Sequence, residues 1–146
     1  MKSVQIPPHV TNTEKKLSNP DYVGPGIWYI IHSKARDAGR SPIPYQAKKE
    51  FRDMMINFSE TFPCLTCREH IKEYLANNSM EAFWGPIYHE VSGEDIGLFK
   101  WTWIFHNVVN ARLAHWGHAK KQMDFDTAYD LYYHSDNTTC SLDCGH

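Results

Sequence analysis

Apolar residues recur along this chain at the three- and four-residue spacing of amphipathic helices, and no stretch shows the alternation of a β-strand. The first helix is predicted at about residues 25–38. Pro25 would lie in its first turn, where proline is tolerated, and Gly39 just after its end. The apolar face of this helix consists of Trp28, Ile31 and Ala35.

Three more amphipathic helices follow, joined by short connections. They are predicted at about residues 45–60, 64–76 and 94–115, the last of them beginning at Glu94 and Asp95. Residues 80–93 are expected to form a packed connection without a definite element. The apolar residues expected to line the second and third helices are Phe51, Met54, Met55, Phe58, Ile71, Tyr74 and Leu75.

A short fifth helix is predicted at about residues 126–133. Five helices with short connections in a chain of 146 residues indicate an all-α fold, an antiparallel four-helix bundle with a short accessory helix. We expect this domain to span residues 21–134, between a flexible N-terminal segment at residues 1–20 and a flexible C-terminal tail at residues 135–146. Sites in such bundles lie between facing helices.

Charge and composition exclude some classes of partner. The formal net charge is −2 and no block of Lys or Arg stands out, so no nucleic-acid partner is expected. The first twenty residues lack the apolar run of a signal peptide or membrane helix, which predicts a soluble protein without a membrane partner. Aromatic residues make up 14% of the chain, and its nine histidines add to them, so the composition favours a flat, stackable ligand.

The four cysteines form two close pairs, Cys64 with Cys67 and Cys140 with Cys144. In a chain without an export signal, such pairs indicate redox chemistry or a metal rather than a structural disulfide framework. Cys64 and Cys67 fall on the first turn of a predicted helix, where they share one side and can close a small disulfide. The helix dipole there favours a thiolate, which supports a redox role.

Two other interpretations of the first pair stay open at this point. Cys64 and Cys67 could be buried thiols, or all four cysteines could bind zinc in a zinc-stabilised helical binding module. A histidine could then replace one of the cysteines, the candidates being His70, His134 and His146. The spacing of Cys140 and Cys144 is looser than that of a zinc knuckle, which weighs against this alternative.

The segment from Trp101 to Leu113 has the most unusual composition of the chain. His106, Asn110 and Leu113 share one face of the predicted helix, with Trp103 one turn earlier and Asn107 at the border. Polar side chains among apolar neighbours are costly in a dry core unless they are hydrogen-bonded. These residues are therefore expected either to face a polar ligand or to form a buried network.

Three motifs together resemble a known family. The pair Cys64-Leu65-Thr66-Cys67 is followed about forty residues later by His106-Asn107-Val108-Val109-Asn110. Upstream lie Gly24, Trp28 and His32 on the first helix. In order and spacing this combination resembles the Erv/ALR family of FAD-linked sulfhydryl oxidases, whose signature is C-x-x-C and then H-N-x-V-N. The resemblance extends over roughly residues 22–133.

The resemblance implies that FAD is the cofactor and lies at the mouth of the bundle, without a dinucleotide-binding sheet and with the Cys64–Cys67 disulfide against the flavin ring. The residues it implies as FAD contacts are Gly24, Trp28, His32, His70, Trp103, His106, Asn107, Val109, Asn110 and Leu113. A looser match adds Lys120, Lys121 and Tyr132, for which a solvated surface is the alternative.

The same resemblance implies a thiol oxidase reaction with Cys64 and Cys67 as catalytic residues. Protein dithiol clients would reduce their disulfide, directly or through Cys140 and Cys144 as a shuttle pair. Electrons would then pass to FAD and on to molecular oxygen, giving hydrogen peroxide. Cys64, the first of the pair, is expected to be the more accessible partner for exchange, and Cys67 to lie beside the flavin.

The resemblance also implies a homodimer formed through the first two helices. Met54, Met55 and Phe58 would then lie in an interface rather than in the core. The additional cysteines that link subunits in many cellular members are absent, so a disulfide-linked dimer is not expected. Compact members occur in large DNA viruses, which favours the cytoplasm, with the mitochondrial intermembrane space as the alternative.

Overall fold

The computed structural model describes the backbone of residues 20–133 and the side chains from Gly24 to Tyr133. The predicted N-terminal segment and C-terminal tail, with the shuttle candidates Cys140 and Cys144, lie outside the described residues. The helical elements in chain order are α2 (Pro20–Arg40), α3 (Pro44–Thr61), α4 (Leu65–Asn77), the 3₁₀ helix η1 (Met80–Phe83), α5 (Gly97–His115), α6 (Phe125–Ala128) and the π-helical turn η2 (Tyr129–Tyr133).

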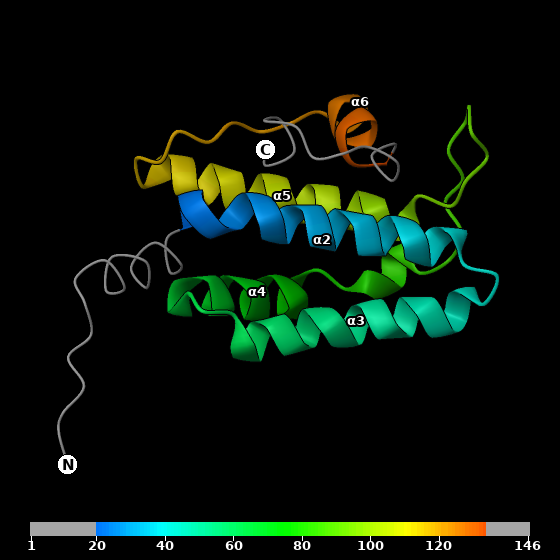
Figure 1. Cartoon of the computed structure of the whole chain (residues 1–146), viewed down its shortest axis with the longest axis horizontal. Coiled ribbons are helices and arrows are strands. Elements are labelled where there is room, and N and C mark those ends of the chain that lie inside the picture. The colour runs from blue at the N-terminus through cyan, green and yellow to red at the C-terminus, as the bar shows by residue number, and fades with distance from the viewer. Residues whose placement is uncertain (1–19, 134–146) are drawn as a thin grey trace, which may run out of the picture.

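The four long helices form an antiparallel bundle, as predicted (Figure 1). α2 and α5 lie side by side above α3 and α4, and consecutive helices run in opposite directions. α6 lies against the outer side of the α2 and α5 layer. The start of α2, the start of α4 and the end of α5 therefore meet at one end of the bundle.

Two apolar clusters hold the helices together. The larger one lies between the four long helices and includes Trp28, Ile31, Ala35, Phe51, Met55, Ile71 and Tyr74, which confirms the predicted faces. Met55 is fully buried in it, so this side chain belongs to the core and is not available for a dimer interface, while Met54 and Phe58 are half-buried. The smaller cluster joins α5 to α6 and η2 through Phe99, Tyr129, Tyr132 and Tyr133.

Two predicted helix starts are wrong. α2 begins at Pro20, so Pro25 lies inside the helix, where it has no N–H to donate to the preceding turn. α5 begins at Gly97 rather than at Glu94. The carboxylate of Asp95 binds backbone groups around the start of the helix and a side chain of α3. Its Oδ1 accepts hydrogen bonds from the backbone N–H groups of Ile87 and Gly97, at 3.1 and 3.0 Å.

A buried ion pair ties α3 to this connection. Lys48 Nζ lies 2.8 Å from Asp95 Oδ2 and donates to the carbonyl of Trp84 at 2.6 Å. The exposed fractions of the two side chains are 4% for Lys48 and 10% for Asp95. Gly39, expected just after the first helix, lies inside α2. Packing demands glycine at this position, because a Cβ there would collide with the carbonyl oxygen of Asp95. The end of α2, the first part of α3 and the segment just before α5 thus meet at Asp95.

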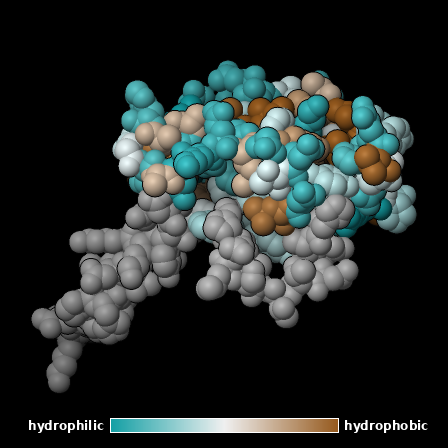
Figure 2. Space-filling model, turned by 90° about the horizontal axis from the view of Figure 1, so that it is seen from above, coloured by the Kyte–Doolittle hydropathy of each residue, from teal (hydrophilic) through white to brown (hydrophobic). Residues whose placement is uncertain are grey.

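The upper face of the molecule is mixed in polarity. Figure 2 shows hydrophilic residues over most of this face, with hydrophobic groups between them. Within residues 20–133, no helix has both the length and the apolar character that crossing a membrane requires.

Candidate active site

A pocket of about 600 Å³ opens at the end of the bundle where α2, α4 and α5 meet. Its walls come from these helices, from the connection before α4 and from residues 116–123 after α5. Eleven of the predicted site residues line it: Cys64, Cys67, Gly24, Trp28, His70, His106, Val109, Asn110, Leu113, Lys120 and Lys121. The fold therefore brings most of the predicted site together from four separate stretches of sequence.

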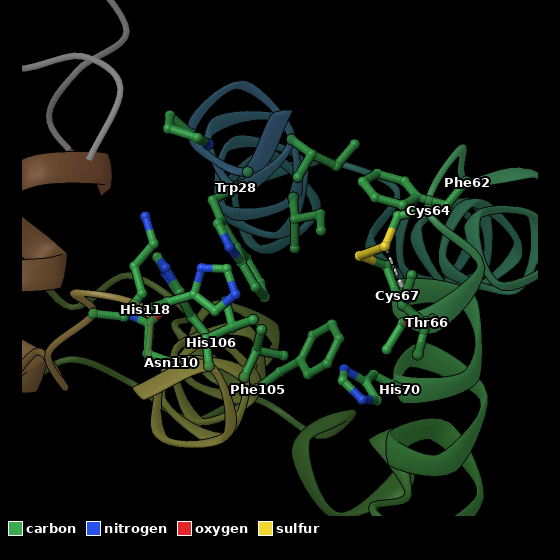
Figure 3. Close-up of a pocket in the computed structure, with 18 of the residues that line it drawn as sticks. Trp28, Phe62, Cys64, Thr66, Cys67, His70, Phe105, His106, Asn110 and His118 are labelled. Carbon is green, nitrogen blue, oxygen red and sulfur yellow. Dashed lines mark hydrogen bonds between the residues drawn. A yellow bond between two sulfur atoms is a disulfide. The ribbon is translucent and has the colours of Figure 1, made fainter. Parts of the chain in front are cut away.

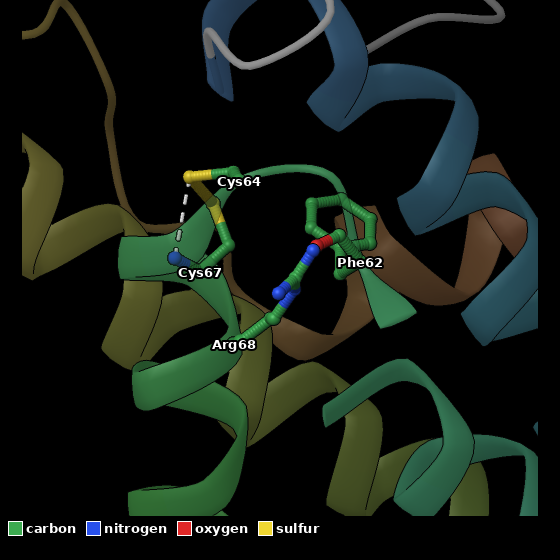
Figure 4. Close-up of a disulfide and its surroundings, with 4 residues drawn as sticks. All are labelled: Phe62, Cys64, Cys67 and Arg68. Carbon is green, nitrogen blue, oxygen red and sulfur yellow. Dashed lines mark hydrogen bonds between the residues drawn. A yellow bond between two sulfur atoms is a disulfide. The ribbon is translucent and has the colours of Figure 1, made fainter. Parts of the chain in front are cut away.

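Cys64 and Cys67 form a disulfide on one wall of the pocket, with 5.1 Å between their Cα atoms. Cys64 is the N-cap residue of α4, and its Sγ accepts a hydrogen bond from the backbone N–H of Cys67 at 3.2 Å. Arg68 follows, and its Nε donates to the carbonyl of Phe62, which fastens the start of α4 to the preceding connection (Figure 4). Figure 3 shows the disulfide facing Trp28 and His106 across the pocket.

The expected order of accessibility of the two cysteines is wrong. Cys64 is buried, with 7% of its surface exposed, whereas Cys67 is only half-buried. The reason is that Cys64 packs within the large apolar cluster, while Cys67 lies at its margin. Taken residue by residue, Cys67 is therefore the more exposed of the two.

Aromatic rings form the opposite wall. Trp28 and His106 stack almost in parallel, with 4.0 Å between ring centroids and 11° between planes. Phe105 meets the edge of Trp28 with 5.2 Å between centroids. This wall offers a flat, largely apolar surface to a bound molecule, as the aromatic content of the sequence led us to expect.

Behind this wall lies a buried histidine pair. His32 Nε2 is 2.9 Å from His106 Nδ1, and His32 Nδ1 is 2.9 Å from Thr102 Oγ1. Burial and then the neighbouring His106 lower the pKa of His32 well below its ordinary value. Burial, followed by the charge of Lys120, lowers the pKa of His106 to about 3. Both rings are therefore neutral at physiological pH.

The asparagines of α5 hold a loop in place. Asn107 Nδ2 donates to the carbonyl of Met123 at 2.8 Å, and the N–H of Met123 donates back to Asn107 Oδ1 at 2.8 Å. Trp103 Nε1 donates to the same carbonyl at 2.7 Å, and Asn110 Nδ2 donates to the carbonyl of Lys121 at 3.1 Å. These side chains fasten residues 116–124 along α5. This loop carries Lys120 and Lys121 into the pocket wall.

Four predicted contacts do not line the pocket. His32 lies behind Trp28 and His106, and the ring of Tyr132 packs on it at 4.2 Å. Burial raises the pKa of Tyr132 to about 12, so its hydroxyl is neutral. Trp103 and Asn107 face the main chain of Met123 instead. All four support the pocket wall from behind.

The structure adds pocket residues that the sequence did not indicate, among them Phe62, Thr66, Ile71, Phe105, Trp116 and His118. Trp116 approaches the ring of His70, with 5.2 Å between centroids. Burial and the charge of Arg112 lower the pKa of His70, against an opposing effect of Glu73. The sequence did offer one signal for these additional residues. Trp116 and His118 follow the predicted helix directly, and aromatic residues beside a predicted site are candidates for its wall.

The zinc alternative finds no support in the described part of the chain. No three His, Cys, Asp or Glu side chains converge there in a way that could hold a metal ion. Cys64 and Cys67 are joined to each other, so neither offers a thiolate ligand. The remaining candidates, Cys140, Cys144, His134 and His146, lie outside the described residues.

Comparison with known proteins places these features in context. A model of the Erv1 / Alr family matches residues 25–130. An FAD-linked sulfhydryl oxidase of African swine fever virus is 33% identical over 90 residues, which cover 62% of this chain and 66% of the viral protein. FAD-linked sulfhydryl oxidase ERV1 of Oryza sativa subsp. japonica is 30% identical over 92 residues, 63% of this chain and 42% of the rice protein.

The mitochondrial FAD-linked sulfhydryl oxidase ERV1 of Saccharomyces cerevisiae is 28% identical over 105 residues, 70% of this chain and 50% of the yeast protein. The chain thus spans between about two fifths and two thirds of the length of these relatives. No solved structure gives a significant match.

Proposed function

Since this chain belongs to the Erv1 / Alr family, we propose that it is an FAD-linked thiol oxidase that makes disulfide bonds in protein substrates. The observation that carries the proposal is the Cys64–Cys67 disulfide on the wall of an aromatic pocket. A redox disulfide beside a flat, apolar cavity is the arrangement that electron transfer between a dithiol and a bound flavin requires. The relatives whose names include FAD and sulfhydryl oxidase support the same proposal.

The residues present fit FAD. A volume of about 600 Å³ lies within the range of small-molecule and cofactor sites. A Cβ at Gly24 would contact nothing closer than the Trp28 ring at 3.9 Å, so packing within the protein does not demand glycine there. A glycine that the fold does not need suits a place where a bound molecule approaches the backbone.

We assign the binding roles from the chemistry of the walls. Trp28 and His106 supply the stacking surface, and Val109 and Leu113 supply apolar contact from α5. Lys120 and Lys121 place positive charge on the loop wall, which suits the two phosphates of a dinucleotide. His32, Trp103, Asn107 and Tyr132 act from behind by positioning these groups.

The thiol chemistry takes place at the disulfide. A thiolate of the client attacks one sulfur of the Cys64–Cys67 bond, and a mixed disulfide forms while the other sulfur leaves as a thiolate. The second client thiolate then attacks the mixed disulfide, which releases an oxidised client and a reduced Cys64 and Cys67 pair. The N–H of Cys67 points at the Cys64 sulfur and can stabilise a thiolate there. FAD held by the pocket residues would supply a two-electron acceptor for the reduced Cys64 and Cys67 pair, with oxygen as the proposed final acceptor and hydrogen peroxide as its product.

The burial of the two cysteine residues suggests which of them the client attacks. Cys67 is the less buried residue, so we propose that exchange with small thiols begins there. Cys140 and Cys144, which lie outside the described residues, are proposed to carry electrons from protein clients to this disulfide. A homodimer through α2 and α3 is part of the proposal, with the exposed Ile30 and Ile56 as candidates for its interface.

Purified full-length chain, reconstituted with FAD, tests the proposal. We expect it to retain the visible absorbance of an oxidised flavin and to consume oxygen when a dithiol is added. Cys64→Ser and Cys67→Ser should keep the flavin and lose the oxygen consumption, because neither variant can form the disulfide. Val91→Ser, at an exposed residue outside the pocket, is the matched control and should behave like the parent. Protein that cannot retain flavin would contradict the proposal.

A further inference from the structure

We propose that Thr102 and His32 are positioning residues that fix the tautomer of His106, so that its Nε2 accepts a hydrogen bond from the bound cofactor. This inference rests on the proposed function, because it concerns how the pocket holds FAD. It is carried by a chain of buried hydrogen bonds that runs from α5 to α2 and back to α5.

The donor and the acceptor of each hydrogen bond in this chain can be assigned by starting from Thr102. Its Oγ1 lies 2.6 Å from the carbonyl oxygen of Phe99 and 2.9 Å from Nδ1 of His32. Two oxygens at 2.6 Å need a proton between them, and only the hydroxyl can supply it. Thr102 therefore donates to Phe99 and has only a lone pair left for His32. Nδ1 of His32 must carry a proton to complete this bond.

The neutral state of His32 determines which nitrogen of His106 holds a proton. His32 is fully buried, and the rings packed on it are Trp28, Phe99, His106 and Tyr132, none of which bears a negative charge. A neutral imidazole has one proton, and Nδ1 holds it. Nε2 of His32 therefore has a lone pair. It lies 2.9 Å from Nδ1 of His106, so that atom must be the donor.

The last step concerns His106, which lines the pocket and is neutral because burial and the charge of Lys120 lower its pKa to about 3. Its single proton lies on Nδ1, so Nε2 is left with a lone pair. Within residues 20–133 no group forms a hydrogen bond to this Nε2. Stacking on Trp28 fixes the plane of the ring, as Figure 3 shows for the labelled pair. We infer that the cofactor brings an N–H or O–H group to this point.

This arrangement makes the pocket selective. A ligand that placed a carbonyl oxygen or an unprotonated ring nitrogen against His106 would set two lone pairs against each other, at the cost of an unmade buried hydrogen bond. Thr102 thus influences ligand choice without lining the pocket, because its proton determines where the protons on both rings lie.

The direct test is nitrogen NMR of the full-length chain with isotopically labelled histidine, at neutral pH, with and without FAD. The parent should show both His32 and His106 as the Nδ1–H tautomer. Thr102→Val keeps the shape but removes the acceptor, so His32 should turn to the Nε2–H form and donate to His106. His106 should then carry its own proton on Nε2. Thr102→Ser keeps the hydroxyl and should reproduce the parent spectrum.

Flavin affinity provides the second measurement. We expect Thr102→Val to bind FAD roughly 10-fold more weakly or worse in a fluorescence titration, because a donor then faces a donor. Thr102→Ser should bind as the parent does. A proton on Nε2 of His106 in the parent would overturn the proposal, and so would unchanged affinity in a Thr102→Val protein whose tautomers have switched.

The two proposals fail in different ways. If the parent binds no FAD, the proposed function is wrong, whereas the histidine spectrum still decides the order of the protons. If the parent binds FAD and His106 is an Nε2–H tautomer, only the present inference is wrong. The parent spectrum decides the matter even if Thr102→Val does not fold, which thermal unfolding would reveal.

Discussion

Replacing Asn107 by alanine should loosen the loop that carries the two lysines of the pocket. Asn107 makes two hydrogen bonds of 2.8 Å with the main chain of Met123, one as donor and one as acceptor. A typical hydrogen bond contributes about 0.5–1.5 kcal/mol net, so the two together contribute about 1–3 kcal/mol. That free energy corresponds to a shift of about 5- to 150-fold toward a detached loop.

Amide hydrogen exchange at Met123 measures this shift directly, because its N–H is one of the two donors. Protection of this amide should fall by about 5- to 150-fold in Asn107→Ala. FAD affinity should fall by less, because it depends on the fraction of molecules with the loop attached. Trp103 and Asn110 still hold the loop in the variant.

Val108→Ala is the matched control. Val108 is the next residue on α5, and its side chain is exposed, so its truncation should leave the Met123 amide unchanged. Equal protection of Met123 in the parent and in Asn107→Ala would refute the reasoning. The asparagine would then not be what fastens the loop, and a direct contact with the cofactor would be its better interpretation.

Three further outcomes follow from the same structure. Below pH 6.5 the free energy of unfolding should fall by about 1.4 kcal/mol per pH unit for each of His32 and His106, because only the unfolded rings take up protons. For His106 this fall in the free energy of unfolding should continue down to about pH 3, and above pH 6.5 these histidines should add no pH dependence to the free energy. Urea unfolding at several pH values measures the free energy of unfolding. Lys48→Met should cost about 3–5 kcal/mol in urea unfolding, because it leaves the buried Asp95 carboxylate without its cation. Cys140→Ser should slow oxygen consumption with protein clients and spare small dithiols, whereas an equal loss with both would contradict a shuttle role.

The spacing of apolar residues was enough to predict the bundle and most of its core. Trp28, Ile31 and Ala35 recur on one helical face, and the structure buries all three, because a four-helix bundle offers each helix a single core-facing side. Part of the pocket lining was predictable for a related reason. Cys64, His106 and Asn110 are residue types that need a special environment, and such residues stand out among apolar neighbours.

What the sequence did not reveal depends on partners far apart in the chain. Asp95 resembled a residue that starts a helix, yet it pairs with Lys48, 47 residues earlier, and α5 begins only at Gly97. Asn107 resembled a ligand contact, yet it binds the main chain of Met123, because the loop after α5 folds back along the helix. No local pattern signals such a return of the chain.

The order of burial of the two cysteines also could not be read from local spacing. Position in a C-x-x-C motif suggested that Cys64 is the more open, but burial depends on which neighbours cover each sulfur. Phe62, two residues earlier, and the large apolar cluster surround Cys64, and most members of that cluster come from elements distant in sequence. Only the packed structure gives this order.

The sulfur of Cys64 has two roles, because it caps the N-terminus of α4 and also forms the disulfide. Both cysteines lie within one helical turn, with their Cα atoms 5.1 Å apart, so the bond can open and close by rotation of side chains on a still backbone. The cap remains in either redox state, because the N–H of Cys67 can donate to a thiolate as it does to the disulfide sulfur. We therefore expect the scaffold to remain rigid while this disulfide is reduced and formed again, without any rearrangement of the helices.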